Sequence, residues 1–549
     1  MEADRAILSS GDASSGRLPA ATGSSDELVQ GSAGDPAGTT DSAAPAAEPE
    51  LEFDADLCHA VADDLQNLGR MAEAESLYRA ALALASDRPD SWANLGLAVL
   101  KEGRAEEAVA CERQALRLDP DNVEALNNLG IALHALDALP EAENHFRGAL
   151  RLVPDHANAT LNLGVIRQSL GHLEEAEALY RRARALGADE ARVCNNLALA
   201  LAELGRLEDA ETVCRAALAA KADYPEAAVN LGMILLMRGK LAEGWPWYEA
   251  RWRVEPLISQ AQLPAETRWS GAGSIEGKTI LLLGEQGFGD VLQFCRYAPM
   301  VARLGAQVIL AVPAVLGRLM GSLKGVDRVV SQDDPLPEFD LHCPLMSLPL
   351  AFDTSAETIP SRVPYLAADP DAIERWRAII PCSSDTPSGT RGLRIGLVWA
   401  GARRPGQPHA AAIDQRRSMK LAEMAPPGTV PGCVFVSLQL GPPAAQIETA
   451  PFPLIDVTDR LTDFADTAAL VGALDLIISV DTAVAHLAGA LGKPVWLLSR
   501  FDACWRWVRD RDDTPWYPTM RLFRQTTPGD WADVMRRVYE ALAGFQTID

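Results

Sequence analysis

The first half of the chain carries a pattern of apolar and small residues that repeats about every 34 positions. In each period a triplet of Asn, Leu and a small residue recurs, starting at Asn94, Asn128, Asn162, Asn196 and Asn230. A glycine stands where the first helix of each unit must end, except at Asp137, and Asp tolerates the left-handed conformation better than most residues. The pattern predicts stacked helix–turn–helix units that form an α-solenoid over residues 53–252.

The second half has a different pattern, in which short apolar runs alternate with helical segments. The runs predict β-strands at residues 280–283, 308–312, 339–342, 395–399, 434–438, 476–480 and 495–498. Strands that alternate with helices form parallel β/α layers. We therefore expect two doubly wound lobes, at residues 253–390 and 391–549, joined by a Pro- and Ser-rich linker at 381–389, with a cleft at the carboxyl ends of their strands.

An aromatic cluster lies where the two patterns meet, at residues 245–248 and Trp252. It could form a ligand surface, or it could pack as a seam between the solenoid and the next domain. The seam is the favoured interpretation, because large aromatic side chains usually bury their area.

Composition separates a short first segment from the rest. Hydrophobic residues make up 48% of the chain, enough for several cores, but residues 1–52 contain no aromatic residue and are rich in Ala, Ser, Gly, Asp and Pro. Such a segment buries too little apolar surface to offset its ordering entropy, so we expect a disordered tail.

The net charge of −25 disfavours binding to nucleic acid or to an anionic membrane surface. Most of the acidic surplus lies before residue 253, so a basic pocket for a phosphorylated ligand remains compatible with the second half. The nine cysteines show no metal-ligand spacing, the first residues do not predict a signal peptide, and no long apolar run appears. We expect a cytoplasmic protein without a transmembrane segment or a metal site.

The first candidate site is the glycine-rich loop at residues 284–290, between a predicted strand and a predicted helix. Its glycines allow a close backbone approach to a ligand, and the helix start offers free N–H groups. Leu292 occupies the third glycine position of the dinucleotide fingerprint, and no phosphate-loop Gly-Lys-Ser/Thr follows. Asp290 could cap the helix or act as a catalytic base, and the two roles are compatible.

The second candidate site follows the predicted strand at 476–480. Asp481 or Thr482 can cap a helix that Gly492 would end, and the amides at the start of that helix suit a diphosphate. His486 lies about one turn later on the same face as Thr482. It could be a structural histidine or part of the site.

Two further segments combine arginine with other polar or aromatic residues. Arg416, Arg417 and Ser418, near Arg403, Arg404 and His409, could hold phosphate oxygens or could form a solvated charged turn. In residues 502–518, Arg506 and Arg509 alternate with Trp505, Trp507 and Trp516. That segment could stack a base or sugar, or it could be a packed loop between the lobes.

Together, residues 285–297, 344–349, 481–489 and 513–518 resemble bacterial tetratricopeptide-repeat glycosyltransferases. The second half is similar to the heptosyltransferases (glycosyltransferase family 9), and the whole layout resembles O-linked N-acetylglucosamine transferases. The resemblance extends over about residues 55–545. It implies a GT-B fold of two Rossmann-like lobes, with the acceptor on the first and a nucleotide-sugar donor on the second. It also implies inverting transfer, without a cofactor or a metal.

The resemblance also implies roles for single residues. Asp290 matches the aspartate proposed as general base, and Asp481, Thr482, Ala483 and His486 match the donor-diphosphate motif. The family often has Gly where Ala483 stands, and a methyl group there would crowd the phosphate. Arg416, Arg417 and Ser418 fall near the phosphate-binding position. A C-terminal helix at about 530–543 would pack back across both lobes.

The asparagine ladder at Asn94, Asn128, Asn162, Asn196 and Asn230 resembles the groove asparagines that hold an acceptor peptide in O-linked N-acetylglucosamine transferases. The alternative is hydrogen bonding between neighbouring helices. Ala60 interrupts the ladder in the first repeat.

Two functions follow. The chain could transfer a sugar from a nucleotide-diphosphate donor to a hydroxyl of a protein or glycan that the repeats present. Alternatively, it could be a non-catalytic interaction scaffold whose transferase domain is degenerate. A nucleotide-dependent dehydrogenase is disfavoured by the glycine pattern.

Overall fold

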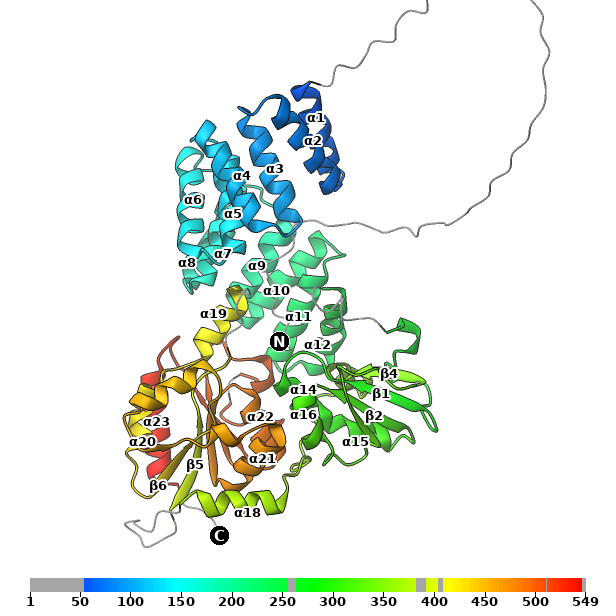
Figure 1. The fold of residues 1–549 in the computed structure, drawn as a ribbon, viewed down its shortest axis with the longest axis vertical. Helices are drawn as coiled ribbons and strands as arrows, with labels where there is room; N and C mark the ends of the chain where they lie inside the picture. The colour runs from blue at the N-terminus through cyan, green and yellow to red at the C-terminus, as the bar shows by residue number, and fades with distance from the viewer. Residues whose placement is uncertain (1–53, 255–262, 382–391, 403–407, 510, 546–549) are drawn as a thin grey trace, which may run out of the picture. The chain divides into compact units, whose positions relative to one another are not determined.

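The computed structural model describes residues 54–254, 263–381, 392–402, 408–509 and 511–545, and only the backbone at 408–410 (Figure 1). The predicted tail at 1–52, residues 382–389 of the predicted linker, and Arg403 and Arg404 lie outside the described residues. The chain divides into two compact units on either side of Ala159, which we consider separately.

The first unit consists of helices that pack in pairs, α1 with α2, α3 with α4 and α5 with α6. Its helices are α1 (Ala55–Asn67), α2 (Met71–Leu84), α3 (Pro89–Lys101), α4 (Ala105–Leu118), α5 (Val123–Ala135) and α6 (Leu139–Leu152). The turn that connects the two helices of the third pair is left-handed at Asp137, with φ of 61°, which confirms the prediction for this position. Ala74, Ala108 and Ala142 are fully buried, so each helix pair closes over a small side chain.

The second unit begins with the remaining repeat helices and continues into two α/β lobes. Helix α7 (Ala157–Ser169) extends from the boundary, and the helices after it are α8 (Leu173–Ala185), α9 (Glu190–Glu203), α10 (Leu207–Ala220), α11 (Pro225–Met237) and α12 (Leu241–Tyr248). A 3₁₀ turn, η2 (Glu249–Arg253), ends the repeats. The architecture is thus an α-solenoid followed by an α/β region, as predicted.

The first lobe is built on a four-stranded parallel sheet in the order β3-β2-β1-β4. Its strands are β1 (Thr279–Leu283), β2 (Gln307–Val312), β3 (Arg328–Ser331) and β4 (Leu341–Pro344). Its helices are α14 (Phe288–Phe294), α15 (Ala298–Ala302), α16 (Ala314–Met320) and α17 (Leu348–Ala351). The chain order reverses between β1 and β4, which is the kind of switch point where ligands bind in open α/β sheets.

The second lobe is built on a six-stranded parallel sheet in the order β10-β9-β8-β5-β6-β7. Its strands are β5 (Leu393–Val398), β6 (Cys433–Ser437), β7 (Leu454–Ile455), β8 (Leu476–Val480), β9 (Val495–Ser499) and β10 (Met520–Arg524). Counted from β7, the strands follow the nucleotide-binding order 3-2-1-4-5-6, with the switch point between β5 and β8.

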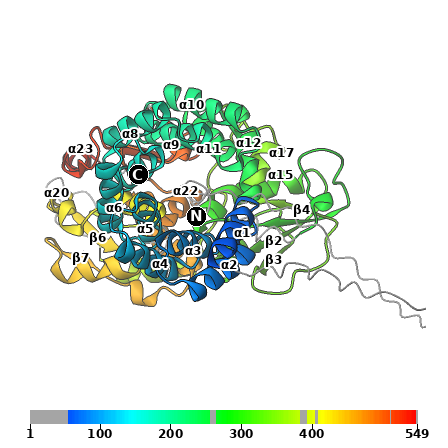
Figure 2. The ribbon, with the colours of Figure 1, turned by 90° about the horizontal axis from the view of Figure 1, so that it is seen from above.

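The helices of the second lobe are α18 (Pro370–Ile379), α19 (Pro408–Arg417), α20 (Ala425–Gly428), α21 (Phe464–Ala473), α22 (Ala483–Ala490) and α23 (Trp531–Ala543). Helices pack against both faces of the sheet, α21 and α22 in one apolar cluster and α23 in the other. Helix α18 precedes the predicted linker yet packs against α21, so the chain reaches the second lobe before residue 381. In both views α22 lies between β6 of the larger sheet and β2 of the smaller one (Figures 1 and 2).

One expectation from the sequence is wrong, and three strands were missed. The C-terminal helix α23 packs against α20 and β10 of its own lobe, with Val534 and Val538 in that lobe's core, and not across both lobes. Strands β3, β7 and β10 were not predicted, because none of them has a long apolar run. In the described part of the chain, no helix is both long enough and apolar enough to span a membrane.

The aromatic residues that end the repeats form a seam, as favoured from the sequence. The indole ring of Trp245 is buried, packs edge-on against Phe294 and Trp505, and donates a hydrogen bond to the Thr354 carbonyl at 2.9 Å. One hydrophobic core therefore continues from α11 and α12 through the first lobe into the second.

Candidate functional site

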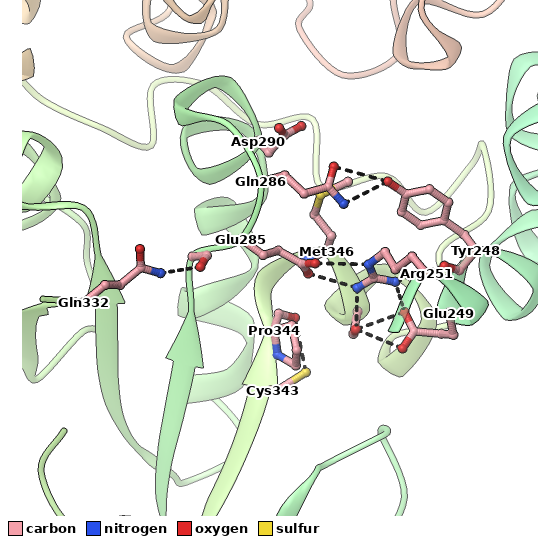
Figure 3. Close-up of polar contacts among 12 residues, drawn as sticks. Tyr248, Glu249, Arg251, Glu285, Gln286, Asp290, Gln332, Cys343, Pro344 and Met346 are labelled. Carbon is pink, nitrogen blue, oxygen red and sulfur yellow. Dashed lines mark hydrogen bonds and ion pairs between the residues drawn. The ribbon is translucent and has the colours of Figure 1, made fainter. Parts of the chain in front are cut away.

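The loop between β1 and α14 lies at the switch point of the first lobe and is held in a strained conformation. Gln286 has φ of 61°, which is rare for a residue other than glycine and costs free energy. The Tyr248 hydroxyl, at the end of the repeats, exchanges hydrogen bonds with the Gln286 amide at 3.0 and 3.3 Å (Figure 3). The last repeat thus helps to fix this loop.

The next contact between repeats and lobe is a buried ion pair. The Arg251 guanidinium donates to both carboxylate oxygens of Glu285 at 2.9 and 3.0 Å, and to the Ser347 hydroxyl at 2.8 Å (Figure 3). The Met346 amide donates to the same carboxylate at 3.0 Å. Burial raises the pKa of Glu285 above its ordinary value, although the Arg251 charge opposes this rise.

Asp290 stands in the first turn of α14, with its carboxyl group pointing away from the Arg251–Glu285 pair (Figure 3). One carboxylate oxygen accepts a hydrogen bond from the Gly287 amide at 2.9 Å, and the other contacts the Arg506 guanidinium. Burial tends to raise the pKa of Asp290, but the Arg506 charge and the Gly287 amide lower it, and the pKa lies below its ordinary value. The carboxylate therefore caps the helix and is ionised at neutral pH.

The start of α22 lies at the switch point of the second lobe. Thr482 is the N-cap residue, but its hydroxyl contacts the Ser479 hydroxyl at 3.0 Å and makes no capping bond to the helix. Ala483 is the first residue of α22, and Gly492 ends the helix region with φ of 71°, as predicted. The amides at this helix start are therefore not used by the Thr482 side chain, which suits an anion.

His486 is buried one turn into α22. Its ring stacks on Trp507 at 5.1 Å, its Nδ1 lies 3.0 Å from the Tyr517 hydroxyl, and its Nε2 lies 3.9 Å from the Asp481 carboxylate. Burial lowers the pKa of His486 to about 4, so the ring is neutral at physiological pH. It can orient a ligand but does not supply a positive charge.

The starts of α14 and α22 face each other closely. A Cβ atom placed on Gly289 would lie 2.9 Å from Cδ2 of His486. Asp290 and His486 are near enough to affect each other's pKa. The fold thus brings together residues from the two candidate segments, which are about 190 positions apart in the sequence.

Arg417 and Ser418 lie beside this site, between the carboxyl ends of β5 and β8. Arg417 donates to the Asp481 carbonyl at 3.2 Å and pairs with Asp414 at 2.7 Å. Ser418 accepts a hydrogen bond from the Gly401 amide at 3.1 Å. Both residues therefore fix the edge of the switch point.

Arg416, although adjacent, points elsewhere. Its guanidinium binds the Asp502 carboxylate at 3.0 and 3.1 Å and pairs with Glu203 of α9 at 3.1 Å. It links the second lobe to the repeats, and its charge is already neutralised by two carboxylates.

Several buried N–H groups around the site have no hydrogen-bond partner among the described residues. They are Nε2 of Gln293, Nε1 of Trp399, Nε of Arg417, Nε of Arg506 and Nε1 of Trp507. Buried unpaired donors are costly and rare in folded proteins. Other such donors lie elsewhere in the described chain, and these five, on α14, after β5 and after β9, fit a site that is completed by a ligand rich in acceptor atoms.

The asparagine ladder is mostly buried. The Asn94 amide donates to Asp63 at 2.9 Å, and the Asn230 amide donates to Asn195 at 2.8 Å. Asn128, Asn162 and Asn196 are between 5% and 8% exposed, and Asn230 is completely buried. For Asn94 and Asn230 the structure has the hydrogen bonds between helices that were the alternative to an acceptor groove.

Sequence reasoning gave no role to Arg251 and Gln293, and it interpreted Arg506 only as a stacking or packing residue. The Arg506 contact joins residues that are 216 positions apart, and no local pattern indicates it. Gln293 could have been noticed as a polar residue in an otherwise apolar helix segment. Among the described residues, no three His, Cys, Asp or Glu side chains come close enough together to hold a metal ion.

Comparison with known families identifies the first region. Family models described as tetratricopeptide repeats match residues 57–90, 98–137, 121–187, 161–225 and 195–251. Residues 57–90 and 98–251 carry tetratricopeptide repeats. Such repeats stack into extended concave binding surfaces, and they indicate protein partners.

Comparison with individual proteins gives one relative and several repeat structures. Protein FlbA of Caulobacter vibrioides is 29% identical over 334 residues, which cover 56% of this chain and 53% of FlbA, so the chain matches about half of that relative's length. A thermophilic tetratricopeptide protein of Thermus thermophilus is 23% identical, over 33% of this chain and 99% of that one, with a TM-score of 0.31. PilF of Pseudomonas aeruginosa is 19% identical, over 38% of this chain and 97% of PilF, with a TM-score of 0.31.

Proposed function

We propose that the chain is a glycosyltransferase with a two-lobed GT-B catalytic region. It would transfer a sugar from a nucleoside-diphosphate donor to an acceptor hydroxyl with inversion of configuration. The observation that carries this proposal is the meeting of Asp290, at the switch point of one parallel sheet, with the start of α22, at the switch point of the other. A carboxylate opposite an anion-binding helix start is the arrangement that such a transfer needs.

The acceptor side of the proposed reaction depends on Asp290. Its carboxylate would take the proton of the acceptor hydroxyl while the hydroxyl oxygen bonds to the anomeric carbon of the sugar. In the same step the bond from that carbon to the donor's diphosphate oxygen breaks, and the nucleoside diphosphate leaves. Because Asp290 is ionised at neutral pH, it can accept a proton without prior titration.

The donor side depends on groups that stabilise the leaving diphosphate. The amides at the start of α22 and the Arg417 guanidinium, with its unpartnered Nε, supply donors where negative charge develops. The neutral His486 ring and Asp481 would position the donor. The proposed reaction uses the donor as a substrate and needs no separate cofactor, and a cytoplasmic location would supply such donors.

The repeats would present the acceptor, which we propose to be a protein, or a glycan carried on one. The last repeats are joined to both lobes by Tyr248, Arg251 and Glu203, so a partner held by them would be fixed relative to the catalytic residues. Most of the chain's acidic surplus precedes residue 253, which favours a basic or neutral partner.

A non-catalytic scaffold is the second candidate, and one observation favours it. Asp290 and His486 are only 8% and 4% exposed, and the methyl group of Ala483 stands where the heptosyltransferase-like motif often has glycine. A site this tightly closed fits a transferase domain that has lost its substrate.

Thermal unfolding with a panel of UDP-, GDP- and ADP-sugars and their free diphosphates separates the two candidates. We expect at least one of these ligands to raise the unfolding temperature, because binding to the folded state alone stabilises it. That nucleotide sugar should then be hydrolysed slowly in the absence of acceptor. If no ligand of the panel shifts the unfolding temperature, the scaffold function is the correct one.

A further inference from the structure

Arg506 lies between the two halves of the site, in the segment that connects β9 to β10. Its Nη2 contacts the Asp290 carboxylate, its Nη1 lies 3.0 Å from the Cys504 sulfur, and its guanidinium stacks over the Trp505 ring at 4.4 Å. Its Nε is buried without a partner among the described residues. Only some of the hydrogen-bond donors of the Arg506 side chain therefore have a partner in this position.

The contact with Arg506 conflicts with the role proposed for Asp290. One carboxylate oxygen is occupied by the Gly287 amide and the other by the guanidinium. A general base must reach the proton that it abstracts within hydrogen-bond distance, and a neighbouring cation makes it a weaker base. In this arrangement Asp290 is held in an inactive pairing.

The same guanidinium is close to the start of α22. It is near enough to His486 of that helix to help lower the pKa of the histidine, and the ring of Trp507, the next residue in the 3₁₀ turn η9 (Trp505–Trp507), stacks on His486. A planar guanidinium binds phosphate oxygens through two parallel hydrogen bonds, and it does so more strongly than a single contact with a carboxylate oxygen. A diphosphate at α22 would therefore compete with Asp290 for Arg506.

The backbone around Arg506 is fixed on one side and strained beside it. Arg509 donates to the Gly205 carbonyl of the repeats at 3.1 Å and anchors the segment. Val508 has φ of 44°, a conformation that is a marked outlier for a β-branched residue. Such strain persists at sites that switch between arrangements.

We infer that Arg506 changes partners during the proposed reaction, from Asp290 in the ligand-free protein to the diphosphate of the donor. This inference rests on the proposed function. Donor binding draws the guanidinium away, and the carboxylate oxygen that it contacted becomes available to accept the acceptor's proton, while the Gly287 amide keeps the other oxygen. After transfer, Arg506 holds the leaving diphosphate, and it returns to Asp290 when the product dissociates. The base is therefore available only when a donor is bound.

A double-mutant cycle on diphosphate binding tests the exchange. The full chain and its variants Asp290→Asn, Arg506→Gln and Asp290→Asn/Arg506→Gln are titrated calorimetrically with UDP, GDP and ADP. Arg506→Gln should weaken binding about tenfold or more, because a charge-assisted pair is lost. Asp290→Asn should tighten binding, because the diphosphate no longer competes with the carboxylate for Arg506.

The decisive quantity is how far that tightening depends on Arg506. Removal of the Asp290 charge favours any nearby anion, with or without Arg506, so we expect a tightening about tenfold larger in the presence of Arg506 than in its absence. Equal tightening in both backgrounds would overturn the inference. Unchanged diphosphate binding in Arg506→Gln would also overturn the inference. In either case, diphosphate binding by the unmodified chain would still support the proposed function.

Two further variants serve as controls. Arg506→Lys keeps the charge and should retain part of the affinity even where Arg506→Gln folds poorly. Arg521→Gln removes an exposed arginine from β10 of the same lobe and should bind like the unmodified chain. If the unmodified chain binds none of the three diphosphates, the proposed function and the inference fail together.

Discussion

Arg416 and Arg417 are adjacent in the sequence, but their side chains have different surroundings. Both were expected near the donor phosphates. In the structure Arg416 is paired with Asp502 and Glu203, whereas Arg417 pairs with Asp414 alone and lies at the switch point beside Asp481, where its Nε has no partner among the described residues. The pair offers a matched comparison of two arginines in one helix.

We predict that Arg417→Gln weakens the binding of a nucleoside diphosphate at least tenfold, because a charged donor is lost from the proposed diphosphate site. Arg416→Gln should leave that affinity within about threefold and should lower the unfolding temperature, because Asp502 and Glu203 each lose one of their partners. Calorimetric titration and thermal unfolding measure the two effects. Equal loss of affinity in both variants would place the diphosphate elsewhere.

Glu112 is a second residue with an unusual environment, in the first unit. It is 1% exposed, and one repeat period later or earlier the same position holds Phe146 or Tyr78. Neither carboxyl oxygen has a partner that meets hydrogen-bond geometry, although the Asn128 side chain favours the ionised form to some extent. Burial raises the pKa of Glu112 well above 4.5.

The raised pKa means that the folded state binds a proton more tightly than the unfolded state does. The stabilisation from this proton is fully present below about pH 4.5. It is lost as the pH rises through the raised pKa of Glu112 in the folded state. We predict that Glu112→Phe raises the free energy of unfolding of the first unit by about 1–3 kcal/mol at pH 8. The variant should also lack the loss of stability that the unmodified chain shows as the pH rises. Hydrogen exchange of α3 to α5, corrected for the intrinsic effect of pH, measures it.

The control for that prediction is Glu106→Gln, which changes an exposed carboxylate on the same helix and should alter stability by less than about 0.5 kcal/mol. Equal protection of the unmodified chain and Glu112→Phe at pH 8 would contradict the assignment of Glu112 as a buried, destabilising acid.

At the scale of elements, the strands that the sequence predicts are those with long apolar runs, such as β1, β2 and β8. Strand β7 has only two residues, and β10 alternates Arg with apolar residues, so neither gives a clear signal. The position of each candidate site at the end of a strand could be predicted. The order of the strands, and with it the meeting of α14 and α22, could not, because it depends on contacts far apart in the sequence.

The contact between α14 and α22 leads to a prediction about two glycines of the first lobe. Gly289→Ala places a methyl group 2.9 Å from His486 and should separate Asp290 from the donor groups. Because small displacements of a catalytic group are costly, we expect kcat to fall about tenfold or more. Gly317→Ala in α16 meets no atom within 4 Å and should stabilise the chain by up to about 1 kcal/mol. Similar kinetics for both variants would show that the α14–α22 contact is not part of the site.

At the scale of the whole second unit, the repeats and the lobes are joined by buried polar contacts as well as by the aromatic seam. The seam could be predicted from a cluster of tryptophans. The Arg251–Glu285 pair could not, because an arginine after a helix and a glutamate in a loop have no distinctive pattern.

We predict that Arg251→Met lowers the free energy of unfolding by about 3–5 kcal/mol, because it leaves the Glu285 carboxylate buried without its partner. Arg253→Met breaks an exposed pair with Asp223 and should cost less than about 1 kcal/mol. Urea unfolding of the two variants measures the difference. A small effect of Arg251→Met would mean that the Arg251–Glu285 pair contributes little to holding the repeats and the first lobe together.

The central claim is that Asp290 and the start of α22 together transfer a sugar from a nucleoside-diphosphate donor. Its most direct test is the release of nucleoside diphosphate from the best donor of the panel, measured for the unmodified chain and for Asp290→Asn. We predict turnover by the unmodified chain, and a loss of at least about 100-fold in Asp290→Asn with donor binding retained. Donor turnover that is unchanged in Asp290→Asn, or the absence of turnover with every donor in the unmodified chain, would contradict the claim.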